Sequence, residues 1–300
     1  MGSTISRGEL FDAKLTNELF NKVKGRSTIA TLCGMDPIPF NGTKEFTFSM
    51  DSEVDIVAEN GAKSNGGATV APVVIVPLKI EYVARVSDEF MTASDEEAIA
   101  ILKAWTDGFS RKAARGLDLM AFHGINPRTG SAAQLIGKNS FDTADDIHVV
   151  TRQAGDNAEN LLENAVAAIG ENDVTGYAFA KTFATELSKI KENGVSQYPE
   201  CKLGANPGAL GGAACDVNST VSNGGDDLAV VGDFVNAFKW GVAKELPLEV
   251  IEYGNPDNDA ELGDLKGHNQ VYLRSEMYIG WGILDVDAFA VVKESDESDS

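Results

Sequence analysis

The chain has 300 residues and carries 25 Lys and Arg against 46 Asp and Glu, which gives a formal net charge of −21. Proteins that bind nucleic acid tightly draw most of their affinity from Lys and Arg, so this balance excludes that class. The three widely spaced cysteines (Cys33, Cys201 and Cys215) exclude a disulfide-stabilised scaffold, and the sequence contains neither a signal peptide nor an apolar run long enough to span a membrane.

Residues 1–35 are predicted to form an N-terminal arm. Within this arm, the stretch Phe11–Val23 has the apolar spacing of a short amphipathic helix. No neighbouring segment offers such a helix a partner. The arm is also locally basic, with five Lys or Arg against three acids between residues 7 and 26.

Residues 44–86 are predicted to form a long β-hairpin. Phe46, Phe48 and Met50 alternate with polar residues, and the alternation continues over residues 54–58. The polar stretch 59–67 forms the tip, and the chain returns through residues 73–86. A two-stranded ribbon is not stable alone in water. Its apolar residues therefore need a surface, either on the same domain or on a neighbouring subunit.

A long helix follows. Ser94–Glu97 has the form of a capping box, and apolar residues then recur at the helical period as far as Ala121. Gly124 is a suitable residue just beyond the helix, and Pro127 prevents any continuation. The predicted helix has about 28 residues and is about 42 Å long.

The remaining residues predict a compact α/β unit and two further strands around a polar loop. The predicted helices are 158–169 and 181–192, the strands are 177–180, 229–231, 248–253 and 270–284, and the loops are the glycine-rich 204–227 and the polar 254–269. The last seven residues, 294–300, predict an acidic, solvated tail.

Five short motifs occur in an order that resembles the major capsid proteins of tailed phages. They are Val231–Phe234 (VGDF), Leu248–Glu252 (LEVIE), Asn269–Glu276 (NQVYLRSE), Gly282–Val292 (GILDVDAFAVV) and Glu59–Ala62 (ENGA) at the hairpin tip. The resemblance covers nearly the whole chain. It implies an α+β, Hong Kong 97-type fold with an N-terminal arm, an extended hairpin called the E-loop, a long spine helix, a P-domain and an A-domain.

The resemblance also implies a division of the chain. The expected parts are the arm (1–35), the E-loop hairpin with its flanking strands (36–86), the P-domain with the spine helix (87–127 and 248–285), the A-domain (128–247 and 286–293) and the acidic tail (294–300).

The function implied is a major capsid protein that self-assembles into the hexamers and pentamers of an icosahedral phage head enclosing double-stranded DNA. The head is expected to form in the host cytoplasm and to expand on DNA packaging. Because the chain begins without a helical scaffolding segment, a separate scaffolding protein is expected, and the alternative is that this chain is an already processed form. Further expected partners are a portal, decoration proteins and DNA held without sequence-specific binding, and no membrane is expected. An encapsulin-like bacterial compartment shell is the alternative, and an acidic α/β enzyme is a more distant one.

The candidate contacts between subunits combine the hairpin with one strand near the C-terminus. They are Phe46, Phe48, Met50, Glu59, Lys63, Arg274 and Glu276. In some members of the family, an E-loop lysine forms an isopeptide bond with an asparagine of a neighbour. Lys63 is placed to be such a donor, but no acceptor asparagine or catalytic acid can be matched in this sequence. For Arg274 and Glu276, an ordinary surface ion pair is the simpler interpretation.

The sequence contains no motif for catalysis, cofactor binding or metal binding. It has no GxxxxGK, GxGxxG or GxSxG, and its three histidines, His123, His148 and His268, lie far apart. His123 is expected to interact favourably with the end of the long helix. Asp257–Glu261 faintly resembles a calcium loop, but Leu262 stands where that loop requires glycine, so a solvated turn is expected.

Overall fold

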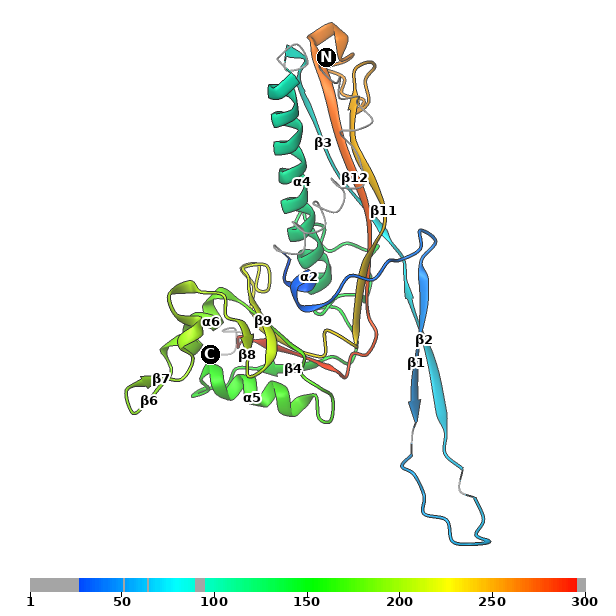
Figure 1. The fold of residues 1–300 in the computed structure, drawn as a ribbon, viewed down its shortest axis with the longest axis vertical. Coiled ribbons are helices and arrows are strands. Elements are labelled where there is room, and N and C mark those ends of the chain that lie inside the picture. The colour runs from blue at the N-terminus through cyan, green and yellow to red at the C-terminus, as the bar shows by residue number, and fades with distance from the viewer. Residues whose placement is uncertain (1–26, 51, 64, 90–94, 296–300) are drawn as a thin grey trace, which may run out of the picture.

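The computed structural model describes residues 27–50, 52–63, 65–89 and 95–295. It shows a mixed α+β chain with three parts (Figure 1). A long helix and a three-stranded sheet form an elongated upper part, and a six-stranded sheet with two helices forms the lower part. A two-stranded ribbon projects away from both. None of the helices in the described ranges has the length and apolar character needed to cross a membrane.

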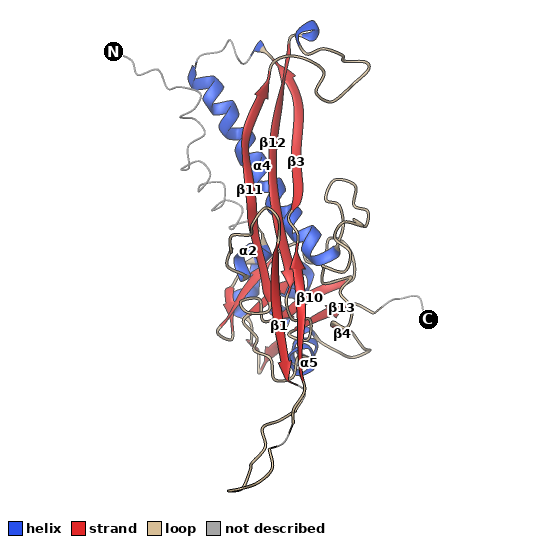
Figure 2. Ribbon diagram, turned by 90° about the vertical axis from the view of Figure 1, so that its right-hand side faces the viewer, coloured by secondary structure: helices blue, strands red, loops and turns tan. Residues whose placement is uncertain are grey.

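The upper part pairs α4 (Asp95–His123) with an antiparallel sheet of order β11 (Phe238–Ile251), β12 (Gln270–Ile283) and β3 (Leu78–Ser87). Trp105 Nε1 donates to Ser275 Oγ at 2.8 Å, so odd-numbered residues of this part of β12 face the helix. The ribbon lies on the opposite side of the sheet from α4 (Figures 1 and 2).

The lower part contains the main core. Its sheet has the order β4 (His148–Thr151), β13 (Phe289–Lys293), β10 (Asp227–Gly232), β5 (Gly176–Phe179), β9 (Ala213–Val217) and β8 (Gly208–Leu210). Helices α5 (Ala158–Ala168) and α6 (Lys181–Lys189) pack against it. Phe141, Phe234 and Phe289 make aromatic contacts with one another in a core that also buries the C-terminal half of α4. The remaining elements are short: α2 (Thr28–Leu32), β6 (Lys191–Glu192), β7 (Val195–Ser196), η1 (Pro199–Gly204) and η2 (Lys266–His268).

A buried aspartate attaches the start of the described chain to α4. Asp118 is fully buried and accepts hydrogen bonds from Ser27 Oγ at 2.6 Å, from Thr28 N at 3.0 Å and from Thr220 Oγ1 at 2.7 Å. Burial raises the pKa of Asp118 to about 6, and these hydrogen bonds oppose the rise. Residue 27, at the start of the described part of the arm, is therefore fixed beside the long helix.

The ribbon consists of β1 (Thr43–Met50) and β2 (Ala68–Ile75), and its root crosses the sheet where the sheet has glycines. A Cβ atom on Gly241 would lie 1.7 Å from the carbonyl oxygen of Asp36, and one on Gly282 would lie 2.8 Å from Ile75 Cγ1. Asp36 N also donates to Trp240 O at 2.9 Å. The segment 34–42 and the end of β2 can approach the sheet this closely because these positions lack side chains.

The structure confirms the long helix, helix 158–168, and the strands predicted near 177–180, 229–231 and 270–284. Gly124, which follows the helix, has φ +65°, as the predicted helix end requires. Three earlier predictions fall outside what the structure describes: the capping side chains at Ser94–Glu97, the arm helix at Phe11–Val23 and residues 296–300 of the tail.

Other predictions were wrong in detail. Residues 54–58 do not continue the first strand, and residues 78–86 leave the hairpin to join the upper sheet as β3, because β12 provides their partner. The second helix ends at Lys189, and a small hairpin follows it. The glycine-rich loop contains β8 and β9, and β11 begins at Phe238 rather than at Leu248.

Candidate subunit interface

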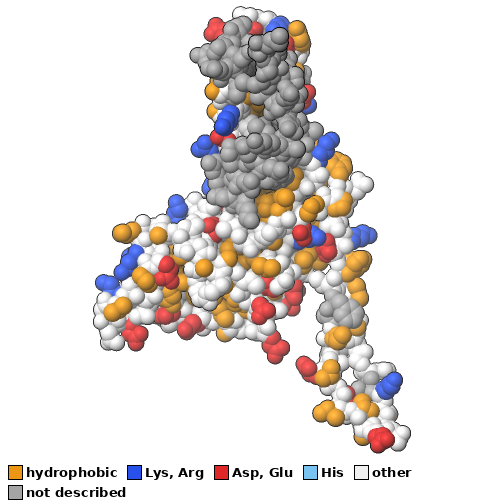
Figure 3. All heavy atoms as spheres, viewed as in Figure 1, with side chains coloured by type: hydrophobic (Ala, Val, Ile, Leu, Met, Phe, Trp, Pro, Cys, Tyr) orange, Lys and Arg blue, Asp and Glu red, His pale blue; other side chains and the backbone are white. Residues whose placement is uncertain are grey.

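One face of the ribbon is apolar and exposed. The register pairs Phe46 with Pro72, Phe48 with Val70 and Met50 with Ala68, so alternate positions of both strands share this face. Phe46 is 66% exposed, Met50 is 74% exposed and Val70 is 54% exposed. Hydrophobic side chains are also visible along the ribbon in the space-filling view (Figure 3). A small two-stranded ribbon with an uncovered apolar face needs a partner surface.

The ribbon tip extends this apolar surface. Val54 is 94% exposed and Ile56 is 97% exposed. Glu59 and Lys63, both candidate contacts, also lie in the exposed tip, and within the described ranges neither makes an ion pair. The structure thus places five of the predicted contact residues, Phe46, Phe48, Met50, Glu59 and Lys63, on one projecting element.

The other two candidates, Arg274 and Glu276, belong to an ion-pair ladder across the upper sheet. Arg274 Nη2 lies 2.6 Å from Glu249 Oε2, and Lys79 Nζ lies 2.6 Å from the buried Glu276 carboxylate. Arg274 Nε is 3.6 Å from the same carboxylate. The hydrogen bond to Glu276 raises the pKa of Lys79. These charges join all three strands of the sheet within one subunit.

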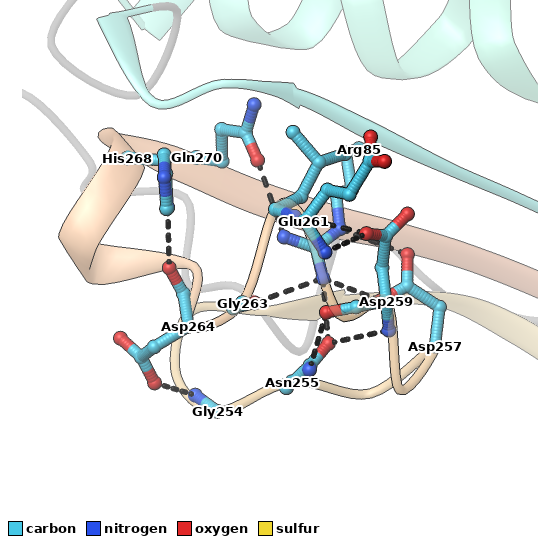
Figure 4. A network of polar contacts seen from close by, with 11 residues as sticks. Arg85, Gly254, Asn255, Asp257, Asp259, Glu261, Gly263, Asp264, His268 and Gln270 are labelled. Carbon is cyan, nitrogen blue, oxygen red and sulfur yellow. Dashed lines mark hydrogen bonds and ion pairs between the residues drawn. The ribbon is translucent and has the colours of Figure 1, made fainter.

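A second polar network organises the loop at the far end of the upper sheet (Figure 4). The Arg85 side chain is only 7% exposed. Its guanidinium donates to both carboxylate oxygens of Asp257, to Asn255 Oδ1 at 2.7 Å and to the Gly263 carbonyl at 3.0 Å. The hydrogen bond from Arg85 lowers the pKa of Asp257 to about 2. An internal arginine therefore occupies the centre of the loop that faintly resembles a calcium site. Residues 257–261 form a largely exposed turn, as expected. The arginine that holds the turn could not be predicted, because it lies 172 positions away in the sequence.

His123, at the end of α4, lies in a compact group of four charges, which we call the His123 quartet: His123, Asp142, Asp227 and Lys293. His123 Nδ1 is 2.7 Å from Asp142 Oδ2 and 3.2 Å from Asp227 Oδ2. Lys293 Nζ is 2.7 Å from Asp142 Oδ1 and 3.1 Å from Asp227 Oδ1. The quartet joins the helix end, the following loop, β10 and β13.

The quartet has the ligand types of a metal site, but its charges already balance. The histidine and the two aspartates have ligand atoms within 4.8 Å of one another. However, the Lys293 ammonium contacts both carboxylates, and His123 Nε2 donates a hydrogen bond to the Thr220 carbonyl oxygen at 2.9 Å. Burial lowers the pKa of His123, but the hydrogen bonds to Asp142, Asp227 and Thr220 outweigh it and raise the pKa to about 10. The group is an ion quartet around an imidazolium, which sequence spacing could not reveal.

The other two histidines and the three cysteines do not belong to the quartet. His148 begins β4, and His268 lies in η2, where its Nδ1 is 3.2 Å from the Asp264 carbonyl oxygen. Cys33, Cys201 and Cys215 are buried free thiols. Burial raises the pKa of Cys33 to about 12, so this thiol stays protonated and unreactive at neutral pH.

Comparison with known proteins agrees with this arrangement. A family model described as the phage capsid family matches residues 8–294. A solved structure from Mycobacterium phage Ogopogo is 31% identical and has a TM-score of 0.76, with 90% of this chain and 92% of that chain covered.

Two further solved structures share the fold at lower identity. One from Gordonia phage Cozz is 24% identical, with a TM-score of 0.73 and with 91% of this chain and 87% of that chain covered. The capsid of a native GTA particle is 16% identical, with a TM-score of 0.63 and 90% of each chain covered. The search of curated proteins returned no match.

Proposed function

This chain belongs to the phage capsid family, and on that basis we propose that it self-assembles into the hexamers and pentamers of an icosahedral head that encloses double-stranded DNA. As a member of this family it is a structural protein of the virion shell, not an enzyme. The proposal extends this identity to the arrangement of the shell and to its contents.

The exposed apolar face of the ribbon carries the proposal. In a single copy nothing in the described structure covers Phe46, Met50 or Val70, and capsid proteins of this family assemble with copies of themselves. A neighbouring copy is therefore the natural cover. Phe46, Phe48 and Met50 would supply the apolar part of this contact, and Glu59 and Lys63 the polar part at the tip. Arg274 and Glu276 would support it indirectly, since they hold together the sheet that the ribbon crosses.

We also propose the division of the chain that the resemblance implies. The ribbon is the E-loop, α4 is the spine helix, and residues 87–127 and 248–285 form the P-domain. Residues 128–247 and 286–293 form the A-domain, and β11 runs from this domain into the P-domain. A separate scaffolding protein, a portal and decoration proteins are proposed partners of a shell that forms in the host cytoplasm.

The ribbon proposal can be tested with two exposed residues near the end of the ribbon. Met50→Glu puts one charge on the apolar face, and Thr69→Glu puts one charge on the other face one register pair away. We expect wild type and Thr69→Glu to form closed shells, tubes or hexamer sheets in negative-stain electron microscopy with the neighbouring genes co-expressed, and Met50→Glu to remain as free subunits. Shells of Met50→Glu at wild-type yield would contradict the role of the ribbon. Wild-type protein that stays near 31.8 kDa would contradict the assembly itself.

An isopeptide bond at Lys63 remains a separate hypothesis. It requires boiled and reduced shells to run as a ladder on a denaturing gel, and Lys63→Arg shells to run as one band. A single band from wild-type shells would exclude the bond while leaving the non-covalent contact intact.

A further inference from the structure

The sequence contains five Asn-Gly pairs, and the structure holds them in different backbone conformations. They are Asn41–Gly42, Asn60–Gly61, Asn65–Gly66, Asn193–Gly194 and Asn223–Gly224. In such a pair the asparagine side chain is open to attack by the next backbone nitrogen, because glycine has no Cβ atom that would shield this nitrogen. The local conformation then decides which of the pairs can react.

The reaction in question is deamidation, and it needs two atoms of the pair to meet. The glycine nitrogen gives up its proton to hydroxide and attacks the asparagine Cγ atom, which closes a five-membered succinimide ring. The side-chain nitrogen takes a proton from water and leaves as ammonia. A water molecule then opens the ring to aspartate or isoaspartate, so the net change is the uptake of water and the release of ammonia. The ring can close only when the glycine nitrogen and the asparagine Cβ lie on the same side of the Cα–C bond.

Three of the pairs are held away from this geometry. Asn60, Asn193 and Asn223 have φ angles of 70°, 51° and 43°, which place them in the left-handed region. The ψ angle typical of that region is about +47°, and it puts the following nitrogen nearly trans to Cβ. These three turns would have to rearrange before the ring could close.

Hydrogen bonds restrain two of the glycine nitrogens. Gly42 N donates to Pro39 O at 2.8 Å, and Gly61 N donates to Ala58 O at 2.8 Å. A proton held in a hydrogen bond is harder to remove, and the turn that contains it must open first. Asn41 is therefore protected although its φ is not positive, and Asn60 is protected twice.

Asn65 lacks both kinds of restraint. Residues 65–67 lie outside any helix, strand or turn, and Asn65 and Gly66 are exposed. The φ of Asn65 is not positive, and among the described residues no group accepts a hydrogen bond from Gly66 N. The pair lies just before β2, in the projecting end of the ribbon (Figure 1).

We propose that Asn65 is a site of spontaneous deamidation, which adds one negative charge to the ribbon tip. The new carboxyl group is ionised at neutral pH. It joins the exposed acids Glu53, Asp55 and Glu59, whereas Lys63 is the one cation of residues 52–63. The modification thus makes an acidic tip more acidic in a chain that already carries −21.

The consequence for assembly rests on the proposed function. Where the ribbon tip meets another acidic copy, the added charge is repelled at the contact. A chain that is modified while it is still a free subunit should therefore assemble less readily than a new one. The reaction would act as a slow timer on unassembled chains.

Peptide mapping by mass spectrometry follows all five pairs in one sample. The unassembled wild-type chain is incubated at pH 7 and pH 8.5, both folded and in concentrated urea. In the folded chain we expect Asn65 to convert several-fold faster than each of the other four asparagines, and faster at pH 8.5 than at pH 7. In urea the five rates should converge. A folded-state rate at Asn65 no higher than that at Asn193, or the same ranking in urea, would overturn the proposal.

A variant of the attacking residue tests the mechanism. Gly66→Ala shields the nitrogen and should slow conversion of Asn65 several-fold, and the nearest atom to the added Cβ is the Ser52 hydroxyl, which can rotate away. Gly267→Ala is the control and should leave the rate at Asn65 unchanged. An unchanged rate in Gly66→Ala would show that Asn65 is lost by another route.

Two substitutions with equal charge changes test the consequence for assembly. Asn65→Asp reproduces the product at the tip, and Asn193→Asp adds the same charge to the turn between β6 and β7. We expect light scattering to show an onset of assembly at a several-fold higher protein concentration for Asn65→Asp than for Asn193→Asp. Equal onsets would overturn this consequence. Absence of particles from the wild type would instead contradict the proposed function and would leave the deamidation rates as measured.

Discussion

At the scale of single residues, the His123 quartet shows how this fold accommodates buried charge. Two acids and two bases lie within contact distance and neutralise one another, so each charge has partners in place of the water it lost. Removing one member would leave the others uncompensated. The quartet thus fixes the end of α4 to the lower sheet.

The pKa of His123 predicts how stability depends on pH. Because the folded pKa of about 10 lies above the unfolded value of about 6.5, the imidazolium contributes its full stabilisation below about pH 6.5 and loses it as the pH rises towards 10. We expect the free energy of unfolding of the wild-type chain to fall between pH 7 and pH 9.5, and that of His123→Gln to fall less. At pH 7 His123→Gln should be less stable by about 2–3 kcal/mol, since its partners are partly exposed.

Urea unfolding of the unassembled chain, followed by tryptophan fluorescence, measures both quantities. The exposed His268→Gln is the matched control and should follow wild type. Parallel pH profiles for wild type and His123→Gln would show that His123 is not charged in the folded state.

At the scale of elements, the crossing of the ribbon root over the sheet is sensitive to a single methyl group. Gly241→Ala would place its Cβ atom 1.7 Å from the Asp36 oxygen, so segment 34–42 or β11 must move. We expect a loss of about 3 kcal/mol or more in stability, at or beyond the upper end of ordinary overpacking. Gly267→Ala, where nothing lies within 4 Å of the added atom, should be neutral. Thermal unfolding of the two variants measures this difference. A Gly241→Ala chain as stable as wild type would mean that segment 34–42 and β11 can move apart at little cost in free energy.

Elements with a strong local signal could be predicted from the sequence. The period of α4, the alternation in β1 and the long apolar run of β12 each depend on neighbours within a few residues. β3 was assigned to the wrong partner because its apolar pattern fits either the hairpin or β12, and only the fold decides between them. Strands β8 and β9 lie in a glycine-rich stretch whose composition indicates a loop.

In the candidate site, too, some features could be predicted from the sequence and others could not. Alternation alone selected the exposed apolar face with Phe46 and Met50, because a strand pattern shows which residues share a face. The partners of Arg85, His123 and Glu276 could not be predicted, since each pairing joins segments far apart in the sequence. A charge in a sequence shows that a partner is needed without showing which one.

At the scale of the whole molecule, net charge opposes assembly. Copies that each carry −21 repel one another, and salt shortens the range of this repulsion from about 30 Å at 0.01 M to about 8 Å at 0.15 M. Because the proposed ribbon contact is mainly apolar, we expect assembly to begin at a lower protein concentration as salt increases. Light scattering at a series of protein concentrations in 0.01, 0.15 and 0.5 M NaCl measures this onset. Assembly that weakens steadily with salt would instead assign the main contact to ion pairs, such as those available to Glu59 and Lys63.

The glycine crossing also has a mechanical consequence. The backbones are in direct contact at Gly241, and the contacts at Gly280 and Gly282 are also close, so few side-chain atoms lie between the sheet and the ribbon root. The ribbon would then tilt as one rigid body about its contact with the sheet. Its eight-residue strands are about 26 Å long, so a tilt of about 5° at this contact moves the far end by roughly 2 Å. A small change of shell curvature would therefore move the contact with the adjacent copy by a distance comparable to an atomic radius. Copies at positions of different curvature would need to adjust to this displacement in the tip, which contains no strand.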